Sequence, residues 1–255
     1  MKYLKEFSTE SDYLAYRDDK SNYLKPNVSL CEGNSTVYYN YPPKPKANGY
    51  EYVDLGLPSG TLWASCNIGA SKPSDYGLYF HWGDTQGYSK EEIEAGKKKF
   101  ASVWSDYKWY LSGSTFDNSI KFKKYTTPGA ILELEDDAAH VNMGGDWHMP
   151  TPEQIRELTN TANTTRTWTT QGSVWGELFT SRTDESKFIF IPAAGMAWDG
   201  SVGDFESYGG IWSSMLSTSD ITIGQYLYFL PVSVGLSSYN RSYGYSVRGV
   251  IDINI

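Results

Sequence analysis

Cysteine and histidine are scarce in this chain, which contains 2 cysteines and 3 histidines among 255 residues. Cys31 and Cys66 have no metal-ligand spacing to each other or to a histidine, so the sequence predicts neither a metal site nor a bound cofactor. Long apolar runs are also missing, and the first residues lack the apolar stretch of a signal peptide. We therefore expect no insertion into a membrane and no ordinary secretion.

Positive charge is in short supply as well. The chain has 22 Lys and Arg against 30 Asp and Glu, which gives a net charge of −8. We expect no nucleic-acid partner, because no basic stripe is present to displace counterions. The lysine run at residues 97–99 is expected at a solvated helix end or loop. The hydrophobic content of 40% and the aromatic content of 16% favour a compact, β-rich body over disorder.

The first part of the chain, residues 1–41, reads as a small module of its own. Ser8 or Thr9 is suited to cap a short helix, and residues 28–30 and 36–39 predict a β-hairpin. So short a unit buries little surface by itself. We therefore expect it to serve attachment, or to form a homo-oligomer with other copies of the chain.

A proline-rich linker, residues 42–48, is predicted to separate this module from one large domain at residues 49–255. Strand patterns with intervening turn residues recur at the start of the large domain, and a helical composition follows them. The predicted strands are residues 51–57, 61–66 and 77–82, and the helical composition covers residues 89–100.

Two helix starts are indicated in the middle of the chain. Thr151, Pro152 and Gln154 form a capping-box pattern, which predicts a helix over residues 152–159. Ile155 and Leu158 are spaced to face the core. Strand and turn patterns then follow at residues 168–180.

The second predicted helix start is a run of acidic residues. Asp136 and Asp137 are expected to begin a short helical turn, because carboxylates accept the free amide protons of a helix N-terminus. Together with Glu133 and Glu135 they are alternatively a calcium site, although the spaced oxygen ligands and glycine of a known calcium loop are missing.

The last quarter, residues 188–250, contains no lysine and is rich in tyrosine, serine and glycine. Phe188, Phe190, Leu227 and Phe229 alternate with their neighbours as in sheet strands. The segments between them carry hydroxyls and aromatic rings, the composition of an antibody paratope. Two interpretations remain open: a binding surface, or an antiparallel sheet whose faces happen to carry tyrosine and serine.

Four tryptophans and one arginine read as structural. Trp63, Trp82, Trp147 and Trp212 are expected to fill the core, each with its indole N–H bonded to one acceptor. Arg248 lies between apolar residues near the chain end, and is expected to pair with a buried acid or with carbonyl groups.

Six ordered blocks resemble one family. VDLGLPSGTLWASCNIGA, YGLYFHWGD, EDDAAHVNMGGDWHMPTPEQIREL, FIPAAG, GGIWSS and GYSVRGV are similar to the gut-bacterial branch of the FISUMP major-paralogue family, over about residues 50–250. The resemblance implies an α+β, C-type lectin-like fold with an irregular antiparallel sheet and supporting helices. The Glu-Pro-Asn, Gln-Pro-Asp and Trp-Asn-Asp triplets of calcium-dependent sugar-binding lectins do not occur, so the fold alone implies no calcium-mediated sugar binding.

The last block also resembles the variable proteins of diversity-generating retroelements, among them tail proteins of phages that infect gut bacteria. In these proteins a fixed scaffold surrounds positions that are rewritten. By this resemblance the ligand-binding positions are Asp199, Ser201, Asp204, Phe205, Tyr208, Ile211, Ser217, Ser219, Ile221, Tyr226, Tyr228, Leu230, Ser237, Tyr239 and Asn240. Tyr226, Tyr228 and Ile211 have the alternative of packing on the sheet.

The function that this resemblance implies is non-enzymatic. It is the binding of a protein or glycan receptor on a bacterial surface, by a phage-tail protein in the virion or outside the cell after lysis. The alternative is a bacterial adhesin of fixed specificity. A sugar-active enzyme is less favoured, because neither a Cys66 nucleophile with His81 or His140 as its base, nor the carboxylate pair Asp199 and Asp204, is supported by spacing.

Overall fold

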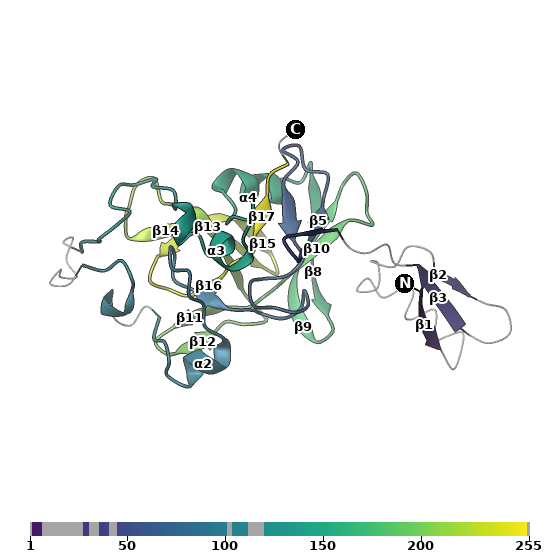
Figure 1. Cartoon of the computed structure of the whole chain (residues 1–255), viewed down its shortest axis with the longest axis horizontal. Helices are drawn as coiled ribbons and strands as arrows, with labels where there is room; N and C mark the ends of the chain where they lie inside the picture. The colour runs from purple at the N-terminus through teal and green to yellow at the C-terminus, as the bar shows by residue number, and fades with distance from the viewer. Residues whose placement is uncertain are drawn as a thin grey trace.

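The computed structural model describes residues 2–6, 28–30, 36–40, 45–100, 104–111 and 120–253. Within these residues the fold is α+β and mainly β: 17 strands form five sheets, and the helices are few and short (Figure 1). Nearly every strand pair is antiparallel, which agrees with the predicted class. None of the helices in the described part is long and apolar enough to cross a membrane.

The first sheet belongs to the N-terminal part of the chain. Strands β2 (Val28–Leu30) and β3 (Thr36–Asn40) pair as the predicted antiparallel hairpin. A third strand, β1 (Lys2–Glu6), pairs with the other edge of β3 and was not predicted. The helix predicted after Ser8 or Thr9 lies outside the described residues.

A four-stranded sheet brings strands from residues 46–64 together with the strand at residues 250–251. Strand β6 (Leu62–Ala64) pairs with β17 (Val250–Ile251), and β5 (Tyr50–Asp54) pairs with β6. The strands β5 and β6 are shorter than the predicted segments, because residues 55–61 form the connection between them and residues 65–66 follow the end of β6. Strand β4 (Lys46–Ala47) pairs with β5, so the end of the predicted linker is part of this sheet.

The next sheet is a meander. Strands β8 (Thr164–Gln171), β9 (Val174–Ser181) and β10 (Phe188–Pro192) pair in sequence order. The hairpin of β8 and β9 begins 4 residues earlier than predicted at residue 168, since Thr164 already pairs with Ser181. Every residue of β10 is buried.

The largest sheet has five strands in the order β15, β14, β13, β16, β7. Strand β13 runs parallel to β16, and the other three pairs of this sheet are antiparallel. A small hairpin of β11 and β12 lies beside it, joined by backbone bridges from Gly195 to Gly209 and from Ala197 to Gly244. The bounds are β7 Tyr79–Phe80, β11 Met196–Trp198, β12 Ser201–Gly203, β13 Gly209–Leu216, β14 Ile223–Leu230, β15 Ser233–Asn240 and β16 Tyr245–Ser246.

The helices begin where the capping residues predict. Helix α4 (Pro152–Thr159) has the complete capping box of Thr151 and Gln154, and its buried face includes Ile155 and Leu158. Helix α2 (Lys90–Glu94) begins at a second capping box, of Ser89 and Glu92, but it covers only part of the predicted helical residues 89–100. Helix α3 (Ala138–Met143) is capped by Asp137, and the short 3-10 turns are η2 (Trp104–Asp106) and η3 (Leu134–Asp136).

The predicted tryptophans fill the core. Trp63, Trp82, Trp147 and Trp212 are each 0% exposed. The indole N–H groups of Trp82, Trp147 and Trp212 donate to the carbonyls of Ser213, Ala47 and Phe80. The prediction is wrong for Trp63, whose N–H has no partner among the described residues.

Arg248 is also placed as predicted. Its side chain is fully buried, and it donates from Nη1 to the Phe190 carbonyl and from Nε to Asn67 Oδ1, each at 2.9 Å. Burial lowers the pKa of this guanidinium to about 10. The arginine therefore ties the chain end to β10 and to the loop after β6.

Candidate functional site

The two faces of the β14–β15 hairpin differ in chemistry. Tyr226 pairs with Ser237, and Leu227 pairs with Leu236. Because side chains alternate along a strand, Tyr226, Ser237 and Tyr239 share one face, whereas Leu227 and Leu236 share the other. The second face is packed into the core with Ile211, Phe229 and Val234. We name the first face, with Tyr226, Tyr228, Leu230, Ser237 and Tyr239, the tyrosine face.

Aromatic rings gather at one end of the tyrosine face. The rings of Tyr226 and Tyr245 stack with centroids 4.8 Å apart, and Tyr239 meets Tyr243 edge-on at the same distance. Edge-to-face and offset arrangements are those that aromatic pairs prefer. The rings therefore hold one another in fixed positions beside the half-buried ring of Tyr208.

Hydroxyl groups link the same rings. The Tyr208 hydroxyl donates to that of Tyr226 at 2.7 Å and lies 3.3 Å from that of Tyr245. The Tyr245 hydroxyl contacts Met196 Sδ at 3.4 Å. Burial raises the pKa values of Tyr208 and Tyr245 above the ordinary value for tyrosine, so both stay neutral and can donate hydrogen bonds.

The other end of the tyrosine face is more open. Tyr228 is half-buried, its ring lies over Gly235, and its hydroxyl is 2.9 Å from Ser233 Oγ. A side chain at position 235 would contact this ring, because a Cβ there would lie 3.4 Å from it. Leu230 at this end is half-buried as well, and the end offers the Tyr228 ring and two hydroxyls to a ligand. Tyr239, which is 36% exposed, and the half-buried Ser237 lie at the end with the ring cluster.

Seven further predicted binding residues lie on loops and turns or at strand ends. Asp199, Ser201, Asp204 and Phe205 are exposed on and after the β11–β12 hairpin, and Ser219 is exposed between β13 and β14. The half-buried Ile221 follows Ser219, and its carbonyl accepts a 3.0 Å hydrogen bond from the buried Arg241. Asn240, also half-buried, accepts hydrogen bonds from Ser242.

Three predicted binding residues are buried and do not fit a contact role. Ile211 is 1% exposed, because it belongs to the core face opposite the tyrosine face. Ser217 is buried, and its hydroxyl accepts from the Ser219 amide. Tyr226 is buried because it packs on Trp212 and Tyr245. Two members of the ring cluster, Tyr243 and Tyr245, were not predicted as binding residues; Tyr245 lies within the GYSVRGV block, and Tyr243 directly precedes that block.

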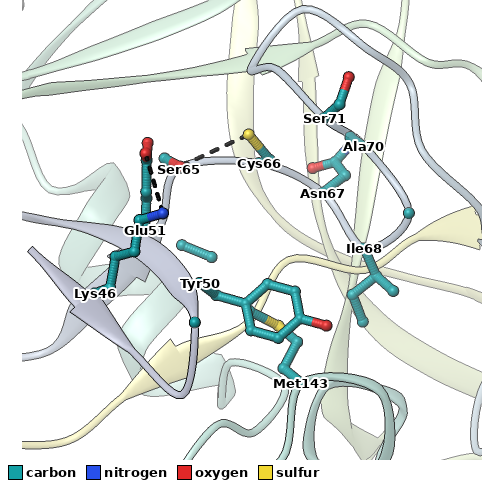
Figure 2. A pocket seen from close by; sticks show the side chains of 13 residues that line it. Lys46, Tyr50, Glu51, Ser65, Cys66, Asn67, Ile68, Ala70, Ser71 and Met143 are labelled. Atoms are coloured by element: carbon teal, nitrogen blue, oxygen red, sulfur yellow. Dashed lines mark hydrogen bonds and ion pairs between the residues drawn. The ribbon is translucent and has the colours of Figure 1, made fainter. Parts of the chain in front are cut away.

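A separate pocket of about 220 Å³ lies between the β4–β5 hairpin and the loop after β6 (Figure 2). Tyr50 and Met143 line one side of it, and Ser65 and Cys66 line the other. Cys66 Sγ lies 3.6 Å from Ser65 Oγ. No hydrogen bond joins Cys66 to a histidine within the described part of the chain, and the His140 ring contacts the Trp147 carbonyl instead.

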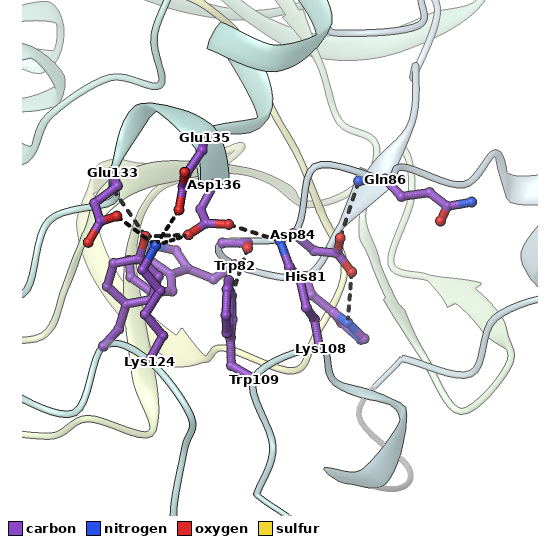
Figure 3. Close-up of polar contacts among 12 residues, drawn as sticks. His81, Trp82, Asp84, Gln86, Lys108, Trp109, Lys124, Glu133, Glu135 and Asp136 are labelled. Carbon is purple, nitrogen blue, oxygen red and sulfur yellow. Dashed lines mark hydrogen bonds and ion pairs between the residues drawn. The ribbon is translucent and has the colours of Figure 1, made fainter.

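The acidic run forms an ion-pair network around one ammonium group. Lys124 Nζ lies 2.7 Å from Glu133, 3.0 Å from Glu135 and 2.6 Å from the buried Asp136 (Figure 3). Lys108 Nζ contacts the other oxygen of Asp136 at 2.9 Å. These three carboxylates are close enough to hold a metal ion, but the lysine occupies the position between them.

His81 lies near this network but takes no part in it. Its ring is packed edge-on against Phe100 and Tyr107, and both ring nitrogens are buried without a hydrogen-bond partner among the described residues. Nδ1 is 4.0 Å from Asp84 Oδ2. Burial, followed by the nearby Lys98, lowers the pKa of His81 well below its usual value, so the ring is a neutral part of the core.

The comparisons with known proteins give no relative. No protein-family model matches the chain, and no curated protein or solved structure is significantly similar to it.

Proposed function

We propose that the large domain is a non-enzymatic binding domain that holds a protein or glycan receptor on a bacterial surface. Tyr228, Leu230, Ser237 and Tyr239 of the tyrosine face, together with the neighbouring exposed residues Asp199, Ser201, Asp204 and Phe205, form its binding surface. In this proposal the domain has a C-type lectin-like fold, and the surface is of the kind that a diversity-generating retroelement rewrites.

The observation that supports this proposal best is the division of the β14–β15 hairpin into two faces. One face packs Leu227, Phe229, Val234 and Leu236 into the core, and the other carries tyrosines and serines, of which Tyr226 is buried and the rest are at least partly exposed. A binding surface that varies needs a scaffold that does not depend on it. Strand alternation provides this, since a substitution at Ser237 or Tyr239 leaves the opposite, apolar face unchanged.

Binding would rest on aromatic anchors and hydroxyl groups. Tyr239 and Phe205 expose 36% and 44% of their surface, respectively. Tyrosine supplies contact area at a small entropy cost, and such residues dominate binding energies at interfaces. The Phe205 ring packs against the Tyr76 ring, with centroids 6.5 Å apart, and Lys90 Nζ lies 5.4 Å from the centroid of the Phe205 ring. Several copies acting together would give firm attachment from weak single sites.

Binding of the labelled full chain to intact gut-bacterial cells, measured by flow cytometry, tests the surface. Tyr239→Ala and Phe205→Ala are expected to weaken binding about tenfold each. Tyr50→Ala is the matched control, because Tyr50 is 42% exposed on another sheet. Equal binding by all three variants would contradict the proposed surface.

Diversification has a test of its own in the DNA that flanks the gene. A near-copy of the segment that encodes residues 195–245, differing only at adenines and lying beside a reverse-transcriptase reading frame, would support it. A flanking region without such a copy would favour a fixed-specificity adhesin of the same fold.

A further inference from the structure

Two tryptophans lie on one face of the β8–β9 hairpin, in a sheet that carries none of the predicted binding residues. Trp168 pairs with Glu177 across the hairpin, and Thr170 pairs with Trp175. Side chains alternate along each strand, so these four residues share a face, with the two tryptophans as diagonal neighbours. The tip of the β14–β15 hairpin lies next to them, because Arg166 on β8 donates to the Leu230 carbonyl at 2.7 Å.

The two indole rings are nearly parallel. Their planes differ by 15°, and their centroids are 6.4 Å apart. Trp168 is half-buried, and its ring packs against that of the core residue Phe229, with centroids 6.5 Å apart. Trp175 is 41% exposed. The Trp168 ring therefore restricts the orientation of the Trp175 ring, so the exposed indole of Trp175 is held in a fixed position.

Unused hydrogen-bond donors surround these rings. The indole N–H groups of Trp168 and Trp175 donate to no group in the described part of the chain, unlike those of Trp82, Trp147 and Trp212. The hydrogen bonds of Arg166 to the described residues all start from Nη2. Nε and Nη1 of this quarter-exposed guanidinium are therefore left for a ligand.

The arginine is held in place from below. Its Nη2 contacts Glu177 Oε2 at 2.5 Å, and the Glu177 side chain is 0% exposed. The second oxygen, Glu177 Oε1, is buried and has no partner among the described residues. A buried carboxylate beside a guanidinium restricts it to one orientation, which fixes where the free donors lie.

We propose that Arg166, Trp168, Thr170 and Trp175 form a carbohydrate-binding site for β-linked pyranose chains. A pyranose ring with equatorial hydroxyls has a flat face of axial C–H groups, which packs on an exposed indole. Its hydroxyl oxygens accept hydrogen bonds, and the free groups here are mostly donors. A saccharide thus matches both the exposed indole and the free hydrogen-bond donors, whereas an apolar peptide side chain would leave these donors without partners.

Isothermal titration of the full chain with cellohexaose and with chitohexaose tests this site. At least one of the two is expected to bind, and Trp175→Ala is expected to weaken that binding tenfold or more. Trp175→Phe should recover part of the affinity, since it restores an aromatic face. An unchanged thermal midpoint for Trp175→Ala would show that the fold is intact, as its exposure predicts.

Phe205→Ala separates this site from the proposed receptor surface. It should leave saccharide binding unchanged while it lowers binding to cells, and Trp175→Ala should do the reverse. Absence of binding by both hexasaccharides, or equal affinities of the natural chain and Trp175→Ala, would overturn the proposal.

Discussion

Replacing Asp137 by alanine should be among the most destabilising single changes outside the apolar core. Its carboxylate accepts hydrogen bonds from the backbone amides of Ala139 at 2.8 Å, His140 at 2.9 Å and Met149 at 2.8 Å. Ala139 and Met149 are at most 1% exposed, so water has little access to these amides once the acceptor is gone. An unsatisfied buried donor costs about 1–3 kcal/mol, and three of them give about 3–5 kcal/mol, allowing for partial relaxation.

Urea unfolding followed by tryptophan fluorescence measures this loss. With a slope of about 3 kcal/mol per molar urea, the midpoint of Asp137→Ala should fall by about 1–1.7 M. Thr151→Ala is the comparison, because it removes one capping bond, to Gln154 at 3.2 Å, and should cost about 1 kcal/mol. If the two variants lost equal stability, the three-amide role of Asp137 would be refuted.

Three further changes test other parts of the structure. Replacing His81 by phenylalanine should reduce the loss of stability that acidification below pH 6.5 causes. The pKa of His81 is lowered in the folded chain, so just below pH 6.5 only the unfolded chain binds the proton, and this favours unfolding. Parallel profiles of urea midpoint against pH for the variant and the natural chain would contradict this. Lys124→Met should remove the one ammonium that all three carboxylates contact, while Lys108 still contacts Asp136. Millimolar calcium should then raise the thermal midpoint of the variant but not of the natural chain. An equal response of both would argue against the ammonium as the occupant. Gly195→Ala should cost about 3 kcal/mol or more of folding stability, because its Cβ would lie 1.9 Å from the Gly203 carbonyl oxygen. Gly172→Ala, also at positive φ but in open space, should cost about 1 kcal/mol. Equal shifts of the thermal midpoint would show that backbone strain, and not the close contact, determines the loss of stability.

Local signals in the sequence predict the helix starts well. Thr151, Pro152 and Gln154 act on one another within a single turn, so the start of α4 follows from four adjacent residues. The acidic run shows the limit of such reasoning. Asp136 and Asp137 are adjacent and identical, yet Asp137 caps α3 while Asp136 binds Lys124, Lys108 and Tyr125. These partners are at least 11 residues away, and no local pattern distinguishes the two carboxylates.

The candidate surface could be predicted only where strand period decides it. Alternation along β14 places Leu227 and Phe229 in the core and Tyr226 and Tyr228 on the other face, as the sequence indicates. The burial of Tyr226 depends on Trp212 and Tyr245, which approach from β13 and β16. Alternation says which face a residue takes, but not what covers that face.

Ile211 shows how the two kinds of information combine. It pairs with Leu227 across β13 and β14, so once this register is known it must share the apolar face of Leu227. A polar residue there would be buried in the core among Phe229 and Ile191, without a partner. Position 211 should therefore stay apolar in any functional variant of this domain, while Ser237 and Tyr239 change freely. Folded variants with polar residues at position 211 would contradict this, because they would show that the packed face of the sheet varies as well as the tyrosine face.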